Sequence, residues 1–291
     1  MTADELIEQG VQHSENGQFA AAVEVYLRAF ELSPKDERLP WEAARLYLYM
    51  LSDPEKAVRW FEASLPLIQN PFKACDTRYH LGLAHTFLKD DTKAAARFEE
   101  VLAHTPTHVL ACIELGKLMT RKGDFERAKD LLQQAVLHNN MRSTLPEMFP
   151  DGQRGSAHAA ALAWMNLGRL GYVASDDEAL GNTAAERLIE DLGDDQRVLM
   201  LAKEAHEAGK PYSALAVLDV FLSYHPDHEE AVQQWVRISL DELGQFDDVV
   251  DLVLQLGEND TKWAERLIDE VLRRKPDHAG ALEYRRVKTK H

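Results

Sequence analysis

The chain has 291 residues, of which 45% are hydrophobic and 28% charged, so a largely disordered or collagen-like protein is excluded. Its formal net charge of −16 repels phosphate backbones, and we expect no nucleic-acid binding. Two cysteines cannot build a disulfide framework and fit a reducing compartment. The acidic start lacks a secretory signal, and no apolar run reaches the roughly 18 residues of a membrane helix. These features predict a soluble cytoplasmic protein.

Residues 3–36 predict two helices joined by a turn at Asn16-Gly17-Gln18. Pro34 ends the second helix, because proline lacks a backbone N–H and clashes with the preceding turn. Small and apolar residues recur at three- and four-residue steps on both sides of the turn: Leu6, Gly10, Val11, Phe19, Ala22, Tyr26, Ala29 and Phe30.

The same pattern returns at 75–108 and again at 109–142. Gly82 follows Gly10 by 72 residues, and Gly116 follows Gly82 by 34, so the interval is nearly constant. Glycine or alanine at the eighth place of each unit lets the two helices cross closely. One such hairpin cannot bury its apolar faces, whereas stacked hairpins can.

The fit is good again at 195–228, whereas two further stretches fit the interval less closely: 37–71 and 161–192. The second of these is interrupted at Gly181-Asn182-Thr183, and Thr183, with Glu186 three residues later, predicts the N-cap of a new helix. Beyond residue 229 the helices persist while the register slips. The basic segment 279–288 predicts a final helix that caps the array.

This repetition resembles the tetratricopeptide repeat, a 34-residue helix-turn-helix unit. The resemblance is carried by Gly10, Phe19, Ala22, Tyr26, Ala29 and Pro34, by Leu81, Gly82, Ala94, Phe98 and Pro106, and by Leu115, Gly116, Gly123, Phe125, Ala128 and Ala135. It implies an all-α fold, a right-handed solenoid of stacked antiparallel helix pairs. We expect an N-terminal array of about four repeats over 1–140 and a C-terminal array over 157–291.

The segment 141–156 contains two prolines and two glycines and has no helical period, which predicts a long loop between the two arrays. We favour a linker that lets the two arrays pivot. The other interpretation is an arm that contacts ligand through Met148 and Phe149.

No catalytic or phosphate-binding signature is present in the sequence, and we expect neither an enzyme nor a cofactor. His104 with His108, and His225 with His228, flank equivalent turns between repeats. Their recurrence favours solvated histidines with a role in turn structure over a metal site, since structural zinc needs four ligands.

The two cysteines differ in their expected surroundings. Cys75 is expected to open a helix, a position that can lower the pKa of a thiol, while Cys112 lies in a helix interior and is expected to pack. We predict a reactive role for neither.

The resemblance also implies a binding surface. In tetratricopeptide arrays the second, fifth, ninth, twelfth and thirteenth places of the first helices line a concave groove. Five of the seven ninth places are basic here: Arg45, Lys117, Arg169, Lys203 and Arg237, alongside Val11 and Leu83. Other groove places carry Trp41, Tyr79, Phe87, Ile113, Met165 and Tyr172, with Ile7 and Leu199.

We therefore hypothesise a basic, aromatic-lined groove that binds an acidic peptide or protein segment. The alternative is that the cations pair with neighbouring acids such as Glu42, Glu114 and Glu204 and neutralise the groove. A clamp for chaperone tails is disfavoured, because Asp4 and Glu8 have the wrong charge for it.

The sequence thus predicts a non-enzymatic scaffold or adaptor for protein–protein interaction. Self-association through terminal repeats is a further expectation, at a face formed by Leu6 with Tyr26 or Phe30. Two other classes stay open: an enzyme with an unrecognised site built from His80, His85 and Glu114, and a helical-repeat RNA binder, which the negative charge disfavours.

Overall fold

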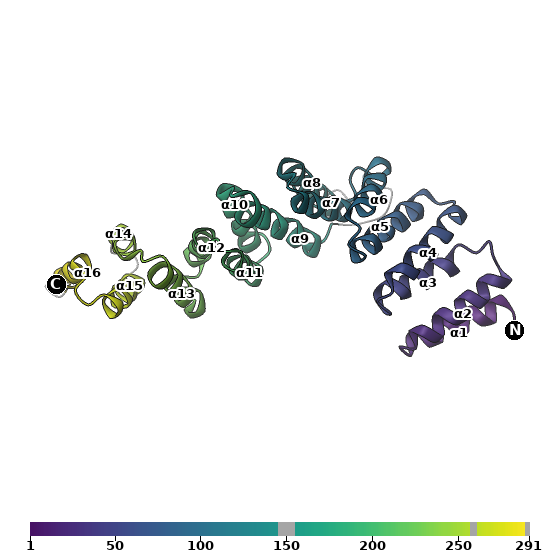
Figure 1. The fold of residues 1–291 in the computed structure, drawn as a ribbon, viewed down its shortest axis with the longest axis horizontal. Coiled ribbons are helices and arrows are strands. Elements are labelled where there is room, and N and C mark those ends of the chain that lie inside the picture. The colour runs from purple at the N-terminus through teal and green to yellow at the C-terminus, as the bar shows by residue number, and fades with distance from the viewer. Residues whose placement is uncertain (145–154, 257–260, 289–291) are drawn as a thin grey trace. The chain divides into compact units, whose positions relative to one another are not determined.

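The computed structural model describes residues 1–144, 155–256 and 261–288, and in these residues the regular structure is entirely helical. Sixteen α-helices are packed as consecutive pairs (Figure 1). The chain divides into two compact units, residues 1–160 and 161–291. None of the helices in this described part has the length and apolar character that crossing a membrane requires.

The first unit consists of four hairpins. Its helices are α1 (Ala3–Glu15), α2 (Phe19–Leu32), α3 (Arg38–Tyr49), α4 (Pro54–Ser64), α5 (Pro71–Phe87), α6 (Asp91–His104), α7 (Val109–Lys122) and α8 (Phe125–Thr144). Local sequence sets the helix starts: Asp53, Asn70 and Asp90 accept backbone N–H bonds as N-caps, and Pro54 and Pro71 occupy the first helical position.

The small residues expected at the eighth place stand where the paired helices cross. A Cβ atom on Gly10 would lie 2.6 Å from Cε1 of Tyr26, and one on Gly116 would lie 2.8 Å from Cγ of Leu132. The close crossing buries Tyr26 and Leu6 almost completely, at 5% and 2% exposure. The expectation that Leu6 and Tyr26 form an open face for self-association is therefore wrong.

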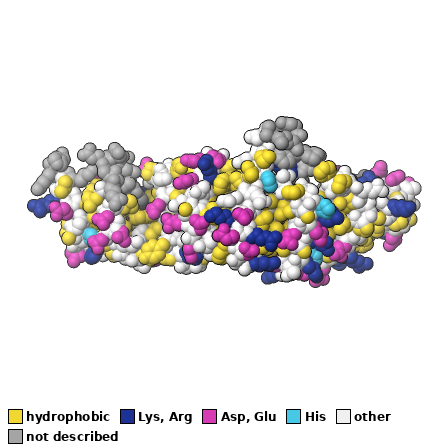
Figure 2. Space-filling model, turned by 90° about the horizontal axis from the view of Figure 1, so that it is seen from above, with side chains coloured by type: hydrophobic (Ala, Val, Ile, Leu, Met, Phe, Trp, Pro, Cys, Tyr) yellow, Lys and Arg dark blue, Asp and Glu magenta, His cyan; other side chains and the backbone are white. Residues whose placement is uncertain are grey.

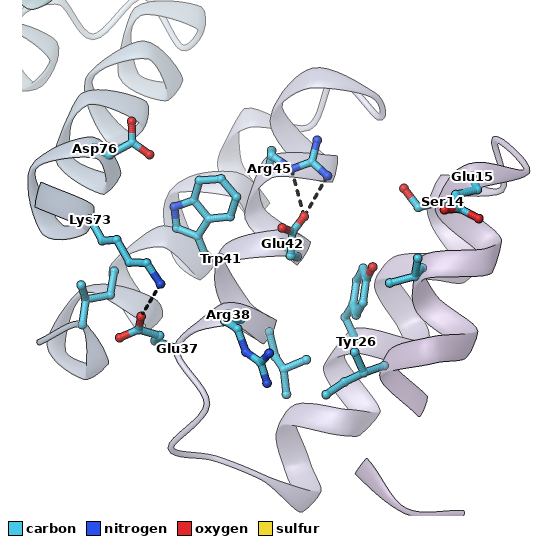
Figure 3. A pocket seen from close by; sticks show the side chains of 14 residues that line it. Ser14, Glu15, Tyr26, Glu37, Arg38, Trp41, Glu42, Arg45, Lys73 and Asp76 are labelled. Carbon is cyan, nitrogen blue, oxygen red and sulfur yellow. Dashed lines mark hydrogen bonds and ion pairs between the residues drawn. The ribbon is translucent and has the colours of Figure 1, made fainter. Parts of the chain in front are cut away.

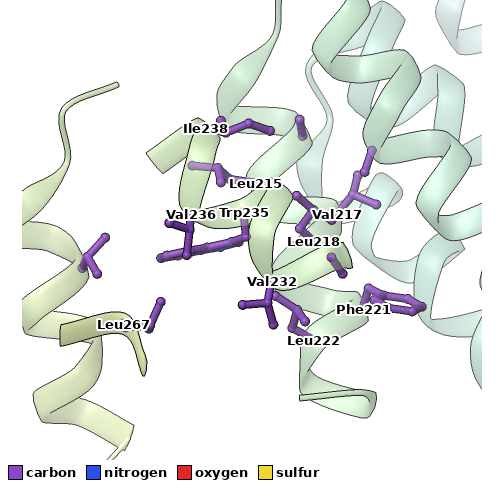
Figure 4. Close-up of a cluster of buried hydrophobic side chains, with 14 of the residues drawn as sticks. Leu215, Val217, Leu218, Phe221, Leu222, Val232, Trp235, Val236, Ile238 and Leu267 are labelled. Carbon is purple, nitrogen blue, oxygen red and sulfur yellow. The ribbon is translucent and has the colours of Figure 1, made fainter. Parts of the chain in front are cut away.

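The second unit continues the pairing. Its helices are α9 (Ala157–Gly168), which begins in the first unit, α10 (Glu178–Glu190), α11 (Asp195–Glu207), α12 (Pro211–Tyr224), α13 (Glu229–Val236), α14 (Phe246–Leu256), α15 (Thr261–Arg274) and α16 (Ala279–Lys288). Its core gathers Leu218 and Phe221 from α12 with Trp235 from α13 (Figure 4). Two π-helical segments, Arg169–Ser175 and Arg237–Glu242, continue α9 and α13.

Helix α10 is continuous, so the expected break near Thr183 is wrong. The helix is capped at Asp177, whose Oδ1 accepts the N–H of Leu180, and the Thr183 hydroxyl donates to the carbonyl of Ala179 within the helix. A Cβ atom on Gly181 would lie 2.8 Å from the Tyr172 ring. This glycine therefore marks close packing, not a helix end.

Helix α8 runs through Met141 to Thr144, so the expected loop begins later than the sequence suggested. Arg142 is 1% exposed and donates to the carbonyl oxygen of Thr107 at 3.2 Å, which anchors this last turn. Residues 145–154, with Met148 and Phe149, lie outside the described residues. Beyond them, Ser156 donates its N–H to Asn139 Oδ1 at 2.9 Å.

Three histidines precede helices, α7, α13 and α16, in the same way. Nδ1 of His108, His228 and His278 accepts the backbone N–H of the residue three positions later, at 3.1–3.3 Å. Each follows a proline by two residues, so the turn and the cap recur together. The role in turn structure expected for His108 and His228 is confirmed, but His108 is 4% exposed, so the expectation that it is solvated is wrong.

Candidate functional site

The five cations expected to make the groove basic all have acidic partners. The closest N–O distances are 2.8 Å for Arg45–Glu42, 2.8 Å for Lys117–Glu114, 2.7 Å for Arg169–Glu204, 3.5 Å for Arg237–Glu242 and 3.8 Å for Lys203–Glu207. The alternative expectation, pairing with Glu42, Glu114 and Glu204, is confirmed. On the face seen in Figure 2, basic side chains likewise lie beside acidic ones.

Several apolar residues assigned to the groove are in the core instead. Ile113, Met165 and Tyr172 are 1–2% exposed and Tyr79 is 9% exposed, so they cannot contact a partner as they stand. Tyr172 lies in a π-helical segment, where the wider turn rotates later residues away from their α-helical direction. Its hydroxyl donates to Asn182.

Trp41 and Phe87 remain accessible among the expected apolar groove residues. Trp41 is half-buried and meets Phe61 and His80 edge-on, with ring centroids 6.3 and 5.8 Å apart. Phe87 is 62% exposed at the end of α5.

A cavity of about 610 Å³ lies in the first unit (Figure 3). It brings together expected groove places of three successive first helices: Ile7, Val11, Ser14 and Glu15 from α1, Arg38, Trp41 and Arg45 from α3, and Asp76 from α5. Of the predicted site residues, Trp41 and Arg45 line it. Ser14, Glu15, Arg38 and Asp76 were missed, although the same repeat register marks their positions.

A cavity of about 830 Å³ in the second unit has a similar origin. Its lining includes groove places of two successive repeats. Lys203, His206 and Glu207 come from α11, Glu230 and Gln233 from α13, and Arg237 and Asp241 from the π-helical segment after α13. Lys203 and Arg237 are the predicted residues found here, and Lys117 and Arg169 line neither cavity.

Arginines of α15 complete the second cavity. Arg274 is bound by Asp241 and by Glu270, and Arg273 donates to Glu270 at 2.6 Å. The Arg274–Asp241 pair joins α15 to the segment that follows α13, whereas both pairs with Glu270 lie within α15. By contrast, the Lys203 and Arg237 side chains are 70% and 56% exposed and have the longest ion-pair distances of the five predicted cations.

Models of one family match both halves of the first unit. Residues 7–73 match one model described as tetratricopeptide repeat, and residues 90–144 match another. The chain is a tetratricopeptide repeat protein. No curated protein sequence matches it.

Solved structures share the fold of this tetratricopeptide repeat protein at low sequence identity. The C-terminal part of a repeat protein from Cytophaga hutchinsonii is 14% identical, with a TM-score of 0.57 over 95% of this chain and 98% of that one. A tetratricopeptide repeat protein from Parabacteroides merdae is 13% identical, with a TM-score of 0.56 over 97% and 96%. A chain of the APC/C hetero-tetramer Cut9–Hcn1 is 17% identical, with a TM-score of 0.53 over 81% of this chain and 42% of that one.

Tetratricopeptide repeat proteins are typically non-enzymatic, and no catalytic domain is identified in this chain. The residues considered for an enzyme site have separate surroundings. His80 contacts Tyr49 through Nδ1 at 2.6 Å, Glu114 pairs with Lys117, and His85 is buried. Across the described ranges, no hydrogen bond or ion pair joins His80, His85 and Glu114 to one another.

Both thiols are buried. Cys75 lies in the second turn of α5, because this helix begins at Pro71, so the expected position at a helix N-terminus is wrong. Burial raises the pKa of Cys112 to about 11, which keeps its thiol protonated. Within the residues that the structure describes, no group of three histidine, cysteine or acidic side chains is arranged to hold a metal ion.

Proposed function

We propose that this protein is an adaptor that binds an extended or helical segment of a partner protein on the surface of its first helices. The observation that carries the proposal is the origin of the two cavities: in each unit, side chains from equivalent places of successive first helices converge on one cavity. Repeats of this family generally mediate protein–protein interactions, and Cut9–Hcn1 is itself a protein assembly.

The second cavity is the better candidate for recognising a carboxylate. Arg45, Lys117 and Arg169 are held by acids at 2.7–2.8 Å, and a ligand would have to displace those acids. Lys203 and Arg237 are more exposed and more loosely paired, so they are available at a smaller cost. An acidic segment is therefore expected to bind through these two side chains.

The test is capture of partners by the immobilised full chain from its own cells, quantified by mass spectrometry. K203E/R237E should lose the main partner that the native chain retains. K35E/K122E is the matched control, because it makes the same charge change at exposed positions outside both cavities. Equal capture by K203E/R237E would contradict carboxylate recognition, and no reproducible partner for the native chain would contradict the adaptor function.

A further inference from the structure

The cavity of the first unit has an apolar wall. Ile7 and Val11 from α1, Leu39 and Trp41 from α3 and Ile68 before α5 contribute to its lining. Val11 is 42% exposed and the Trp41 ring is half-buried, so apolar surface remains open to a ligand. The volume of about 610 Å³ falls in the range of roughly 300–1,000 Å³ that is typical of small-ligand sites.

Acidic side chains outnumber basic ones in the lining of this cavity. Each lining cation already has an acidic partner: Arg38 pairs with Asp36, Arg45 with Glu42, and Lys73 with Glu37, at 2.6, 2.8 and 3.1 Å. Two further carboxylates line the cavity, those of Glu15 and Asp76.

Neither of these two carboxylates is paired with a lysine or arginine in the described part of the chain. Nε2 of His80 lies 3.6 Å from Asp76, and this ring carries charge only when protonated. Glu15 comes from α1 and Asp76 from α5, on opposite sides of the cavity in Figure 3. The cavity therefore presents negative charge beside its apolar wall.

Two tyrosines have raised pKa values, chiefly because they are buried. For Tyr26, which lines the cavity, the charges of Glu42 and Glu15 add to the rise in pKa and that of Arg45 opposes it. Burial and then the charge of Asp76 raise the pKa of Tyr49 to about 12, again against Arg45.

We propose that the cavity of the first unit binds an arginine or lysine side chain of a partner segment. The aliphatic stem would lie against Val11 and the Trp41 ring, while the cationic head meets one of the two carboxylates, Glu15 or Asp76, that stand on opposite sides of the cavity. This inference rests on the proposed function and gives it a second specificity: a basic residue at the first unit, distinct from the acidic contact at Lys203 and Arg237.

The first test uses a small probe and needs no partner. N-acetyl-arginine N-methylamide is titrated into the full chain, and the indole N–H resonances are followed by NMR. The chain has five tryptophans, and the Trp41 resonance is the one that W41F removes. The arginine probe should shift it in a saturable way, and the neutral citrulline analogue should not. Equal shifts by both, or no shift with arginine, would overturn the proposal.

Variants test the roles of the carboxylates. E15Q/D76N should weaken binding of the arginine probe by about fivefold, because each solvent-accessible charge pair contributes modestly. E24Q/E31Q is the matched control: it removes two negative charges from exposed positions of α2 that do not line the cavity. Circular dichroism checks that both variants are folded. Equal weakening in both would reduce the effect to overall charge and overturn the site.

The experiments distinguish failure of the basic-residue site from failure of the adaptor function. An unshifted Trp41 resonance together with intact partner capture would remove this inference and leave the adaptor function standing. If the probe fails and E15Q/D76N instead dissociates a dimer of the native chain, the occupant is a second copy, and the inference is overturned.

Discussion

A Cβ atom on Gly82 would lie 2.5 Å from Cε1 of Phe98, closer than real Cβ atoms approach a ring. Gly10 with Tyr26 and Gly116 with Leu132 repeat this relationship at the same separation of sixteen residues. The glycine thus sets how closely the two helices of a repeat cross, and the large side chain fills the space that its missing Cβ leaves.

Gly82→Ala should destabilise the protein by about 1–2 kcal/mol, because the cost of overpacking exceeds the gain in helix propensity. Urea unfolding followed by circular dichroism measures the change. The loss should be smaller in a Phe98→Leu background, where the ring is absent. Equal losses in both backgrounds would show that the contact with the ring is not the cause.

The sequence predicts the fold best where a small residue of one helix packs against a large side chain of its partner helix. Gly10, Gly82 and Gly116 identified the crossings and, through them, the repeat. The sequence did not reveal the π-helical segments that begin at Arg169 and Arg237, because an extra residue in a turn is selected by packing and leaves no periodic pattern. Gly181 was misread for a related reason: the Tyr172 ring that requires it comes from another helix.

The cap at His228 gives a second prediction. His228→Ala should destabilise the second unit by about 1 kcal/mol, because the N–H of Ala231 loses its acceptor. His228→Asn should retain most of the stability, since asparagine is a good N-cap. Both variants lose the ring contact with Phe221, so their difference in thermal unfolding isolates the cap. Equal losses would assign the effect to the ring.

Buried His85 predicts a pH dependence. Burial lowers the pKa of His85, and its Nδ1 has no hydrogen-bond partner within the described residues. The unfolded chain therefore binds a proton more readily than the folded one. Stability should fall as the pH drops below about 6.5, the ordinary value for histidine, towards the lower folded pKa.

The measurement is the urea midpoint at pH 7.5 and at pH 5.5. The loss between these values should be smaller in His85→Leu than in the native chain. His104→Leu, which removes an exposed histidine, should leave the loss unchanged. A native chain that is more stable at pH 5.5 because of His85 would contradict the sign.

The candidate site was only partly predictable. Repeat register placed Trp41 and Arg45 at one cavity and Lys203 and Arg237 at the other, since equivalent places of stacked helices meet on one surface. The register does not predict that the Ile113 side chain is buried, because burial at a given repeat place depends on the size of the neighbouring side chains. Nor does spacing alone decide whether a cation meets a ligand or an acid from the next repeat.

Arg169 and Glu204 show this last point and give the final prediction. Nε and Nη2 of Arg169 donate to the two carboxylate oxygens of Glu204, both at 2.7 Å, across one repeat. A double-mutant cycle with R169M and E204Q, measured by urea unfolding, should give a coupling energy of about 1 kcal/mol, because the bond is bidentate and half-buried. The exposed Lys203–Glu207 pair, at 3.8 Å, should give about 0–0.5 kcal/mol in the matched cycle K203M/E207Q.

Since Arg169 is held in this way, R169M should not reduce partner capture, whereas K203E/R237E should. Equal coupling energies in the two cycles would show that Arg169 is held no more firmly than Lys203, and loss of the partner with R169M would show that Arg169 serves binding.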